Sequence, residues 1–236
     1  MKTVVLISAD GEWRALKLLL QSADTQDGPL GARIEAAVDG RRVIFFHGGW
    51  GRVSASATTQ YVIDTLHPDL LVNLGTCGGF EGRIERGTIM LVERTIIYDI
   101  VEQMTNSAEA IEHYSTILDL HWLPTHPPTP VTRGLLVSGD RDIVAEDIPG
   151  LVRRYDAVAA DWESGAIAWV ADRNRKRLLI LRGVSDLVGS DGGEAYGDYD
   201  LFLSRTREIM DGLLKALPLW LTAIEDRIHS TQAQNI

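Results

Sequence analysis

Residues 158–186 (VAADWESGAIAWVADRNRKRLLILRGVSD) decide the fold that we predict for this chain. An apolar run over residues 157–160 leads into a helical pattern with apolar side chains three and four positions apart. A basic turn follows, and a second apolar run covers residues 178–181. The pattern predicts a strand–helix–strand unit, whose crossover connection is typical of a parallel pair of strands.

Each of these two strands is followed by a carboxylate. Glu163 comes just after the first strand and Asp186 just after the second. Open α/β sheets bind ligands beyond the carboxyl ends of their strands, so the two acids are candidates for one crevice. By itself, this stretch favours a simpler interpretation. Glu163 then lies in the first turn of one helix, and Asp186 caps the next.

Composition restricts the class of protein. A chain of 236 residues with 45% hydrophobic residues can bury one large α/β core, here predicted over residues 1–228 with a polar tail at 229–236. The net charge of −10 argues against a nucleic-acid partner, and no apolar segment is long enough to span a membrane. Cys77 is the single cysteine and the histidines lack metal-ligand spacing, so we expect a soluble cytoplasmic protein without a metal.

Two glycine-rich segments follow predicted strands. Thr3–Ile7 is a short apolar strand that leads to Glu12 at the start of a helix, and Asp39-Gly40 indicates a hairpin. The second hairpin strand leads into Gly48-Gly49-Trp50-Gly51, before a helix over residues 53–66. A further strand over residues 70–74 is predicted to open into a loop, Gly75-Thr76-Cys77-Gly78-Gly79. Such glycines let backbone N–H groups approach an oxygen-rich ligand, although neither segment is a P-loop.

Fewer sequence motifs support the remaining predicted strands, helices and loops. We expect strands over 87–92, 95–101 and 134–138, a helix near 108–120, and a proline-rich loop over 123–130 as an insertion or subunit contact. The glycine-rich and acidic segment 189–198 is a candidate mobile lid. A long amphipathic helix over about residues 199–227, interrupted near Pro218, closes the chain.

In their order and spacing these motifs resemble the nucleoside phosphorylase/nucleosidase superfamily, closest to the 5′-methylthioadenosine/S-adenosylhomocysteine nucleosidases. Four segments carry the resemblance: the Glu12 loop, residues 49–53, residues 73–79, and Asp161-Trp162-Glu163 paired with Arg182-Gly183-Val184-Ser185-Asp186. The resemblance implies a three-layer α/β/α sandwich with a mixed, partly barrel-like central sheet. It also implies a homodimer and a small-molecule nucleoside substrate.

The resemblance implies a role for each matching residue. Asp186 would protonate the purine at N7, Glu163 would bind the sugar hydroxyls, and Glu12 would activate water. Further binding residues would be Trp50, Gly75, Thr76, Cys77, Gly78, Asp142, Ile143, Trp162, Arg182 and Ser185. The backbone of Ile143 would contact the edge of the base, and the implied reaction needs no cofactor.

Two alternatives to a hydrolase stay open: an enzyme that uses phosphate as the nucleophile, and a protein that binds nucleosides without catalysis. The bacterial phosphorylases that resemble this fold carry an arginine where this chain has Asn73, and a Gly-Asp-Pro-x-Arg loop where it has an acid, Glu12. That acid would repel phosphate, so water is the expected nucleophile. Arg14, Arg52 and Arg182 keep a phosphate-dependent phosphorylase open, and a non-catalytic nucleoside-binding protein is the third hypothesis.

At several positions expected to contact the substrate, this chain differs from the family that it resembles. An aromatic residue that stacks on the base is usual where this chain has Asp142, and losing it forfeits about 1–3 kcal/mol of stacking. Methionine is usual at Trp162, and a small aliphatic residue is usual at Trp50, near the 5′ side of the sugar. A futalosine-type or another purine nucleoside therefore remains an alternative substrate.

Overall fold

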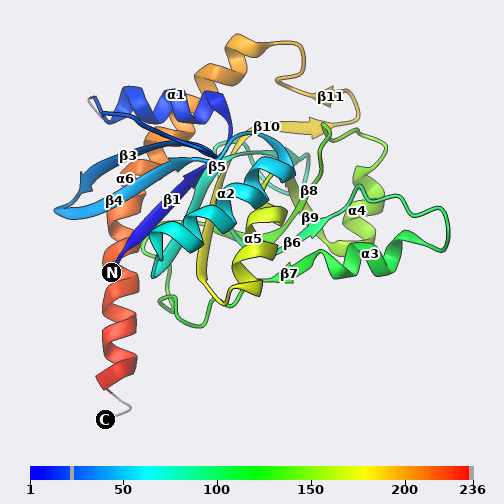
Figure 1. Ribbon diagram of the computed structural model, residues 1–236. Helices are drawn as coiled ribbons and strands as arrows, with labels where there is room; N and C mark the ends of the chain where they lie inside the picture. The colour runs from blue at the N-terminus through cyan, green and yellow to red at the C-terminus, as the bar shows by residue number, and fades with distance from the viewer. Residues whose placement is uncertain (22–23, 234–236) are drawn as a thin grey trace.

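A mixed sheet of eleven strands forms the centre of the computed structural model, which describes residues 1–21 and 24–233 (Figure 1). The strands are β1 (Thr3–Ile7), β2 (Gln26–Gly28), β3 (Gly31–Val38), β4 (Arg41–His47), β5 (Leu70–Phe80), β6 (Ile89–Ile97), β7 (Ser115–Ile117), β8 (Thr132–Ser138), β9 (Ala157–Asp161), β10 (Arg177–Gly189) and β11 (Gly192–Gly193). The helices are α1 (Asp10–Leu19), α2 (Gly51–Leu66), α3 (Ser107–His113), α4 (Ile148–Tyr155), α5 (Ser164–Arg173) and α6 (Tyr199–Ala233).

Five strands of the sheet close on themselves. The hydrogen-bonded order runs β10–β6–β8–β9–β5, and β5 pairs again with β10, which completes a small barrel. From β5 the sheet continues outward through β1, β4, β3 and β2. Parallel and antiparallel pairs both occur, so the predicted mixed, partly barrel-like sheet is confirmed.

Helices cover both faces of the sheet. Alternate residues of β1 point to opposite sides: Val4 and Leu6 pack in one apolar cluster, and Val5 and Ile7 in another. The first cluster includes residues of α2 and α5, whereas the second includes residues of α1 and α6. Because both faces are covered, β1 is apolar throughout, and the predicted α/β/α layering is confirmed (Figure 1).

The predicted hairpin around Asp39 and Gly40 is confirmed. β3 and β4 pair antiparallel, and the two turn residues have φ angles of 49° and 75°. Positive φ at both central positions is the type I′ geometry, which matches the twist of the flanking strands.

The predicted pairing within residues 158–186 is wrong. In the described chain, β9 and β10 do not pair with each other; β9 pairs antiparallel with β5, and β10 pairs parallel with β5. The eleven-residue β5 is long enough to offer one edge to β10 and the end of its other edge to β9. The carboxyl end of β9 and the bulged part of β10 therefore lie on either side of β5.

The second glycine-rich segment is part of a strand, not a loop as predicted. β5 continues through residues 75–79, which pair with β10 and, at Gly78 and Gly79, with β9. A Cβ at Gly79 would lie 2.7 Å from side-chain atoms of Ile84 and Val184. Glycine at this position permits close packing inside the barrel. The prediction of a loop relied only on the high glycine content of the segment.

Two further segments differ from the prediction. Residues 89–97 form one strand where two were expected, with an irregularity in the pairing with β8 between Val92 and Arg94. α3 ends at His113, and the following residues form β7 instead of continuing the helix. The short β7 pairs with β6. Hydrogen bonds to this strand therefore take the place of those within the last turns of the expected helix.

α6 passes through Pro218 without the predicted interruption and extends beyond residue 227 to Ala233. Leu217, Trp220 and Leu221 flank the proline and are fully buried. Their burial keeps this part of α6 packed on the domain and offsets the lost backbone hydrogen bond. Part of the predicted polar tail, residues 234–236, lies outside the described residues. In the part of the chain that is described, no helix is long and apolar enough to cross a membrane.

Candidate active site

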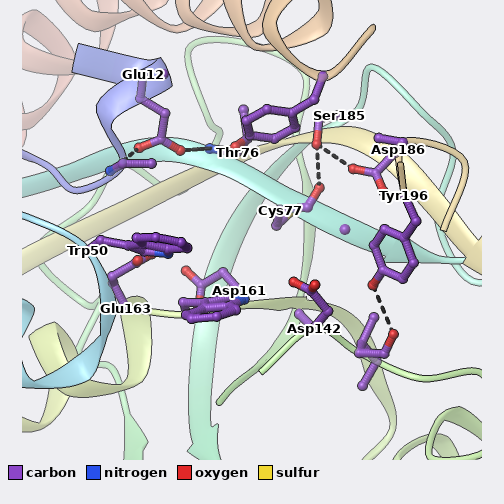
Figure 2. A pocket seen from close by; sticks show the side chains of 18 of the residues that line it. Glu12, Trp50, Thr76, Cys77, Asp142, Asp161, Glu163, Ser185, Asp186 and Tyr196 are labelled. Atoms are coloured by element: carbon purple, nitrogen blue, oxygen red, sulfur yellow. Dashed lines mark hydrogen bonds between the residues drawn. The ribbon is translucent and has the colours of Figure 1, made fainter. Parts of the chain in front are cut away.

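A cavity of about 730 Å³ lies beyond the carboxyl ends of β1, β4 and β9 and beside the long strands β5 and β10 (Figure 2). Its size suits a small organic ligand. All predicted site residues line it except Gly75 and Arg182, which lie beside it: Glu12, Trp50, Thr76, Cys77, Gly78, Asp142, Ile143, Trp162, Glu163, Ser185 and Asp186. The structure therefore brings together acids that are distant in the sequence.

Glu12 is a buried carboxylate whose position is determined by three donors. Its Oε1 accepts hydrogen bonds from the backbone N–H of Thr76 at 2.6 Å and from the Thr76 hydroxyl at 3.0 Å. Its Oε2 accepts from the backbone N–H of Ala9 at 3.3 Å. Only 2% of Glu12 is exposed, so the first turn of α1 presents a fixed acceptor to the cavity.

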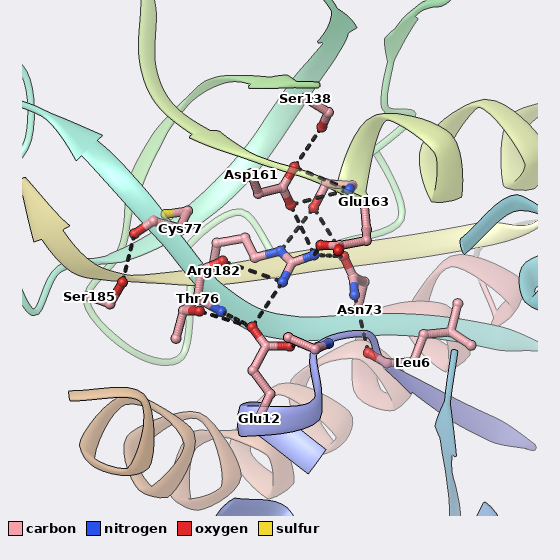
Figure 3. Close-up of polar contacts among 12 residues, drawn as sticks. Leu6, Glu12, Asn73, Thr76, Cys77, Ser138, Asp161, Glu163, Arg182 and Ser185 are labelled. Carbon is pink, nitrogen blue, oxygen red and sulfur yellow. Dashed lines mark hydrogen bonds and ion pairs between the residues drawn. The ribbon is translucent and has the colours of Figure 1, made fainter. Parts of the chain in front are cut away.

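Arg182 lies at the centre of a buried polar cluster (Figure 3). Its guanidinium donates to the Ser164 hydroxyl at 2.9 Å and to the Asn73 side-chain oxygen at 3.0 Å. It also lies near three carboxylates, with N···O distances of 3.5 Å to Glu12, 2.9 Å to Asp161 and 3.9 Å to Glu163. One cation thus faces several acids, an arrangement that favours a ligand with positive charge over an anion.

Asp161 belongs to this cluster although the sequence did not suggest a role for it. Its carboxylate accepts from the Ser138 hydroxyl at 2.6 Å and from the backbone N–H of Ser164 at 3.2 Å. The sequence does contain one signal that could have indicated a role for Asp161: it ends an alanine-rich strand directly before Trp162-Glu163. Among the described residues, no group of His, Cys, Asp and Glu is arranged to hold a metal ion.

Gly75 explains how Glu12 and Arg182 can approach each other. A Cβ at this position would lie 2.0 Å from Nη1 of Arg182 and 2.5 Å from Oε1 of Glu12. Any larger residue would therefore force the two side chains away from this position. The glycine supports the site by leaving space, and it does not line the cavity.

Glu163 links the first glycine-rich turn to the start of α5. Its Oε1 accepts from the backbone N–H of Gly51 at 3.0 Å. Burial, together with the nearby Asp161 carboxylate, raises the pKa of Glu163 to about 8 against the lowering effects of Arg182 and the Gly51 N–H. A pKa in this range favours the protonated form of Glu163 near neutral pH.

This raised pKa predicts a pH-dependent effect of Glu163→Gln on stability. The folded protein keeps a proton up to about pH 8 that the unfolded chain loses near 4.5. Stability from this proton is fully present below pH 4.5 and is lost as the pH rises to about 8. The glutamine variant never ionises, so its melting temperature relative to wild type should rise on the order of 10 °C between about pH 5 and pH 9.

Differential scanning calorimetry over this pH range measures the effect. The matched control is Glu208→Gln, because Glu208 lies exposed on α6 and outside the cavity. A difference in melting temperature that is constant with pH for Glu163→Gln would contradict a buried, protonated Glu163.

Asp186 lies on β10 next to a bulge between residues 184 and 186. The Ser185 hydroxyl lies 2.6 Å from Oδ1 of Asp186 and 3.3 Å from the carbonyl oxygen of Cys77. Burial raises the pKa of Asp186, whereas the Ser185 hydroxyl and Arg205 lower it less strongly. A carboxyl group with a raised pKa that faces a cavity is suited to donate a proton.

Cys77 is packed and is not placed to act as a nucleophile. The side chain is buried, and burial raises the pKa of its thiol far above neutral pH. A thiol in this state is not the reactive thiolate.

Aromatic side chains line several parts of the cavity (Figure 2), among them Tyr199 and Phe202 at the start of α6. Trp50 and Trp162 stack with ring centroids 5.3 Å apart and an interplanar angle of 28°. Tyr196, near Asp142 and Asp186, donates a hydrogen bond from its hydroxyl to the carbonyl oxygen of Ile143 at 2.8 Å. The sequence did not single out Tyr196, because its segment was interpreted only as a lid.

The family of the chain follows from comparison with known proteins. A model described as the phosphorylase superfamily matches residues 3–217, so the protein belongs to this superfamily. One similar protein is the 5′-methylthioadenosine/S-adenosylhomocysteine nucleosidase of Staphylococcus saprophyticus. It is 27% identical over 199 residues, which cover 75% of this chain and 83% of that protein.

Two solved structures share the fold. The 5′-methylthioadenosine/S-adenosylhomocysteine nucleosidase of Colwellia psychrerythraea, in complex with adenine, has a TM-score of 0.72 and 20% identity, covering 93% of this chain and 96% of that one. The apo 5′-methylthioadenosine nucleosidase of Arabidopsis thaliana has a TM-score of 0.74 and 24% identity, covering 95% of this chain and 96% of that one. At these identities the likeness establishes the fold.

Proposed function

We propose that the protein hydrolyses the N-glycosidic bond of a purine nucleoside of the 5′-methylthioadenosine/S-adenosylhomocysteine type. The observation that carries the proposal is that Glu12, Glu163 and Asp186 line one cavity while Arg182 is already surrounded by acids. The names of similar proteins support the same substrate class. The products would be the free base and the sugar.

Asp186 is the proposed general acid. Its raised pKa favours a carboxyl group that still carries a proton, which can pass to N7 of the purine. The bond between the base nitrogen and C1 of the sugar then breaks, and its electron pair leaves with the base. Protonation makes the base a better leaving group because it avoids an anionic product.

Glu163 is the proposed partner of the sugar. Breaking the glycosidic bond leaves positive charge on the sugar ring, and a carboxylate beside the ring stabilises that charge. The developing charge also favours the ionised form of Glu163, whose proton passes to solvent water as the substrate binds. Its hydrogen bond from Gly51 at 3.0 Å determines where the carboxylate lies.

Glu12 is the proposed base for the attacking water. Its carboxylate accepts a proton from water as the water oxygen bonds to C1 of the sugar. The donors at Thr76 and Ala9 fix Glu12 before the reaction, so little reorganisation is needed.

Water is favoured over phosphate because the cationic side chains near the site already have partners. Arg182 is the one fully buried cation among the described residues, and it contacts Glu12 and Asp161. Arg52 pairs with Asp99 at 2.6 Å and with Asp140 at 2.9 Å. Phosphate would therefore meet carboxylates without a free buried cation, and its desolvation would be poorly compensated.

Base release from a panel of nucleosides tests the proposal. Methylthioadenosine, S-adenosylhomocysteine, adenosine, inosine and futalosine would each be incubated with and without phosphate. Release from at least one nucleoside at a rate independent of phosphate is expected. Release only with phosphate would support a phosphorylase, and binding without release would support a nucleoside-binding protein.

Trp50 is proposed to restrict the 5′ end of the substrate. The indole is 68% exposed, lines the cavity and stacks on Trp162. Trp50→Ala should raise kcat/KM for S-adenosylhomocysteine relative to methylthioadenosine by roughly tenfold, because truncation makes room for the longer substituent. Trp50→Phe, which keeps a ring, is the control. An unchanged ratio in the alanine variant would place the 5′ end elsewhere.

A homodimer is part of the proposal. Val53, Val101 and Met104 are 82%, 75% and 92% exposed, and Arg52 pairs with Asp99 between their segments. Such exposed apolar side chains in neighbouring segments suit contact with a second copy of the chain. The mass of the protein in solution, measured by light scattering, tests this part.

A further inference from the structure

Tyr196 connects two walls of the cavity. It lies in the segment between β10 and α6, and its hydroxyl donates to the carbonyl oxygen of Ile143, 53 positions earlier in the chain, at 2.8 Å. Figure 2 shows the Tyr196 ring beside Asp186 and Asp142 in the cavity. The ring is therefore at the same end of the cavity as the proposed general acid.

Gly193 provides the space in which this ring lies. A Cβ at Gly193 would be 2.5 to 2.7 Å from three atoms of the Tyr196 ring. The backbone N–H of Tyr196 donates to the carbonyl of Gly193 at 3.0 Å, which closes a tight turn. The backbone of Gly193 and the ring thus form one packed unit that a methyl group would disrupt.

Glu194 attaches the same turn to the rest of the protein. Its carboxylate accepts from Arg86 at 3.1 Å, from Arg205 at 3.0 Å and from the backbone N–H of Leu187 at 3.2 Å. These contacts lie beside Tyr196 in the chain and hold its turn against β10. The position of the ring is therefore specified by contacts on both sides of it.

The cavity also lacks an aromatic surface at the position where the resemblance leads us to expect one. Asp142 stands there, and a carboxylate cannot stack on a base. Tyr196 lies near both Asp142 and Asp186, and its half-buried phenol stays protonated because burial and these two carboxylates raise its pKa. A neutral ring at this place can offer the missing surface.

We propose that Tyr196 is a base-binding residue: its ring forms the wall against which the purine lies, and its bond to Ile143 holds that wall in place. This inference rests on the proposed function, since it concerns the base of the same substrate. The aromatic surface comes from the segment after β10 instead of the segment after β8. Loss of a base–aromatic contact lowers affinity by roughly 5- to 150-fold.

Calorimetric titration with free adenine tests the inference on four variants. Tyr196→Ala removes the ring, and Gly193→Ala displaces it without changing Tyr196; both should weaken adenine binding at least about 5-fold. Tyr196→Phe keeps the ring and loses one neutral hydrogen bond, so its affinity should lie between that of the wild type and that of Tyr196→Ala. Gly212→Ala is the control, because a Cβ there meets nothing within 4 Å.

Three results would overturn the inference. Unchanged adenine affinity in both Tyr196→Ala and Gly193→Ala would mean that the ring does not contact the base. Tighter binding in these variants would mean that the ring occludes the base site. A wild-type protein that binds no adenine would also count against a base wall at this end of the cavity.

The same titrations separate this inference from the proposed function. If the wild-type protein binds adenine but releases no base from any nucleoside, the hydrolytic function fails while the variant affinities still decide the role of Tyr196. If release occurs normally and the variants match wild type in affinity and in kcat/KM, the function stands and the role of Tyr196 fails.

Discussion

Replacing Asp186 with asparagine is expected to lower the rate of base release by about 10²- to 10⁴-fold. Asparagine keeps the size of the side chain, and its amide oxygen can still accept from the Ser185 hydroxyl 2.6 Å away in the wild type. It cannot supply a proton, so the purine must leave without protonation. Steady-state release of adenine, followed by its change in absorbance, measures the effect, and an unchanged melting temperature shows that the fold is intact.

A substrate that needs no acid provides the control for this variant. In a 4-nitrophenyl riboside the leaving group departs as a stable anion, so Asp186→Asn should hydrolyse it at a rate close to that of the wild type. An equal loss on both substrates would mean that Asp186 supports binding or structure instead. Full activity of the variant on the purine nucleoside would remove Asp186 from the mechanism.

Glu12→Gln is expected to lower kcat by about 10²-fold or more with little change in the affinity for adenine. The glutamine cannot accept a proton from water. In the wild type, Oε1 accepts hydrogen bonds from both the N–H and the hydroxyl of Thr76. An amide nitrogen in the place of Oε1 could not accept them. Steady-state kinetics together with adenine titration separates a chemical defect from a binding defect.

Glu35→Gln is the matched control for Glu12→Gln, since Glu35 lies on β3 away from the cavity and pairs with Arg42. Its kinetics should match the wild type. If Glu12→Gln raised KM and left kcat unchanged, Glu12 would bind the substrate and would not activate water.

The proposed catalytic acids could be predicted because each follows a short apolar segment. Glu163 and Asp186 lie past such segments, and the general tendency of ligands to bind beyond strand ends was enough to bring them together. The pairing behind that prediction was nevertheless wrong, because β5 lies between β9 and β10. β10 also continues to Gly189, so Asp186 lies within this strand and not past its end as predicted. Because β9 runs antiparallel to β5 and β10 runs parallel to it, the two acids meet across β5 and not at the ends of a parallel pair.

Other parts of the structure could not be predicted because they depend on long-range contacts. Glycines at 75–79 were interpreted as a loop, but they lie in β5, where Gly75 makes room for Arg182 and Glu12. Composition cannot distinguish a glycine that allows a turn from one that allows close packing. Likewise, the contacts of Asp161 with Arg182 and of Tyr196 with Ile143 exist only after the barrel has closed.

The origin of the oxygen at C1 of the sugar product tests the central claim most directly. The protein would be incubated with methylthioadenosine and phosphate in water enriched in ¹⁸O, and both products would be analysed by mass spectrometry at early times, against an enzyme-free sample that corrects for exchange. We predict free adenine and a sugar that carries ¹⁸O at C1 without phosphate. A sugar 1-phosphate product, or no adenine release, would contradict hydrolysis by water at this site.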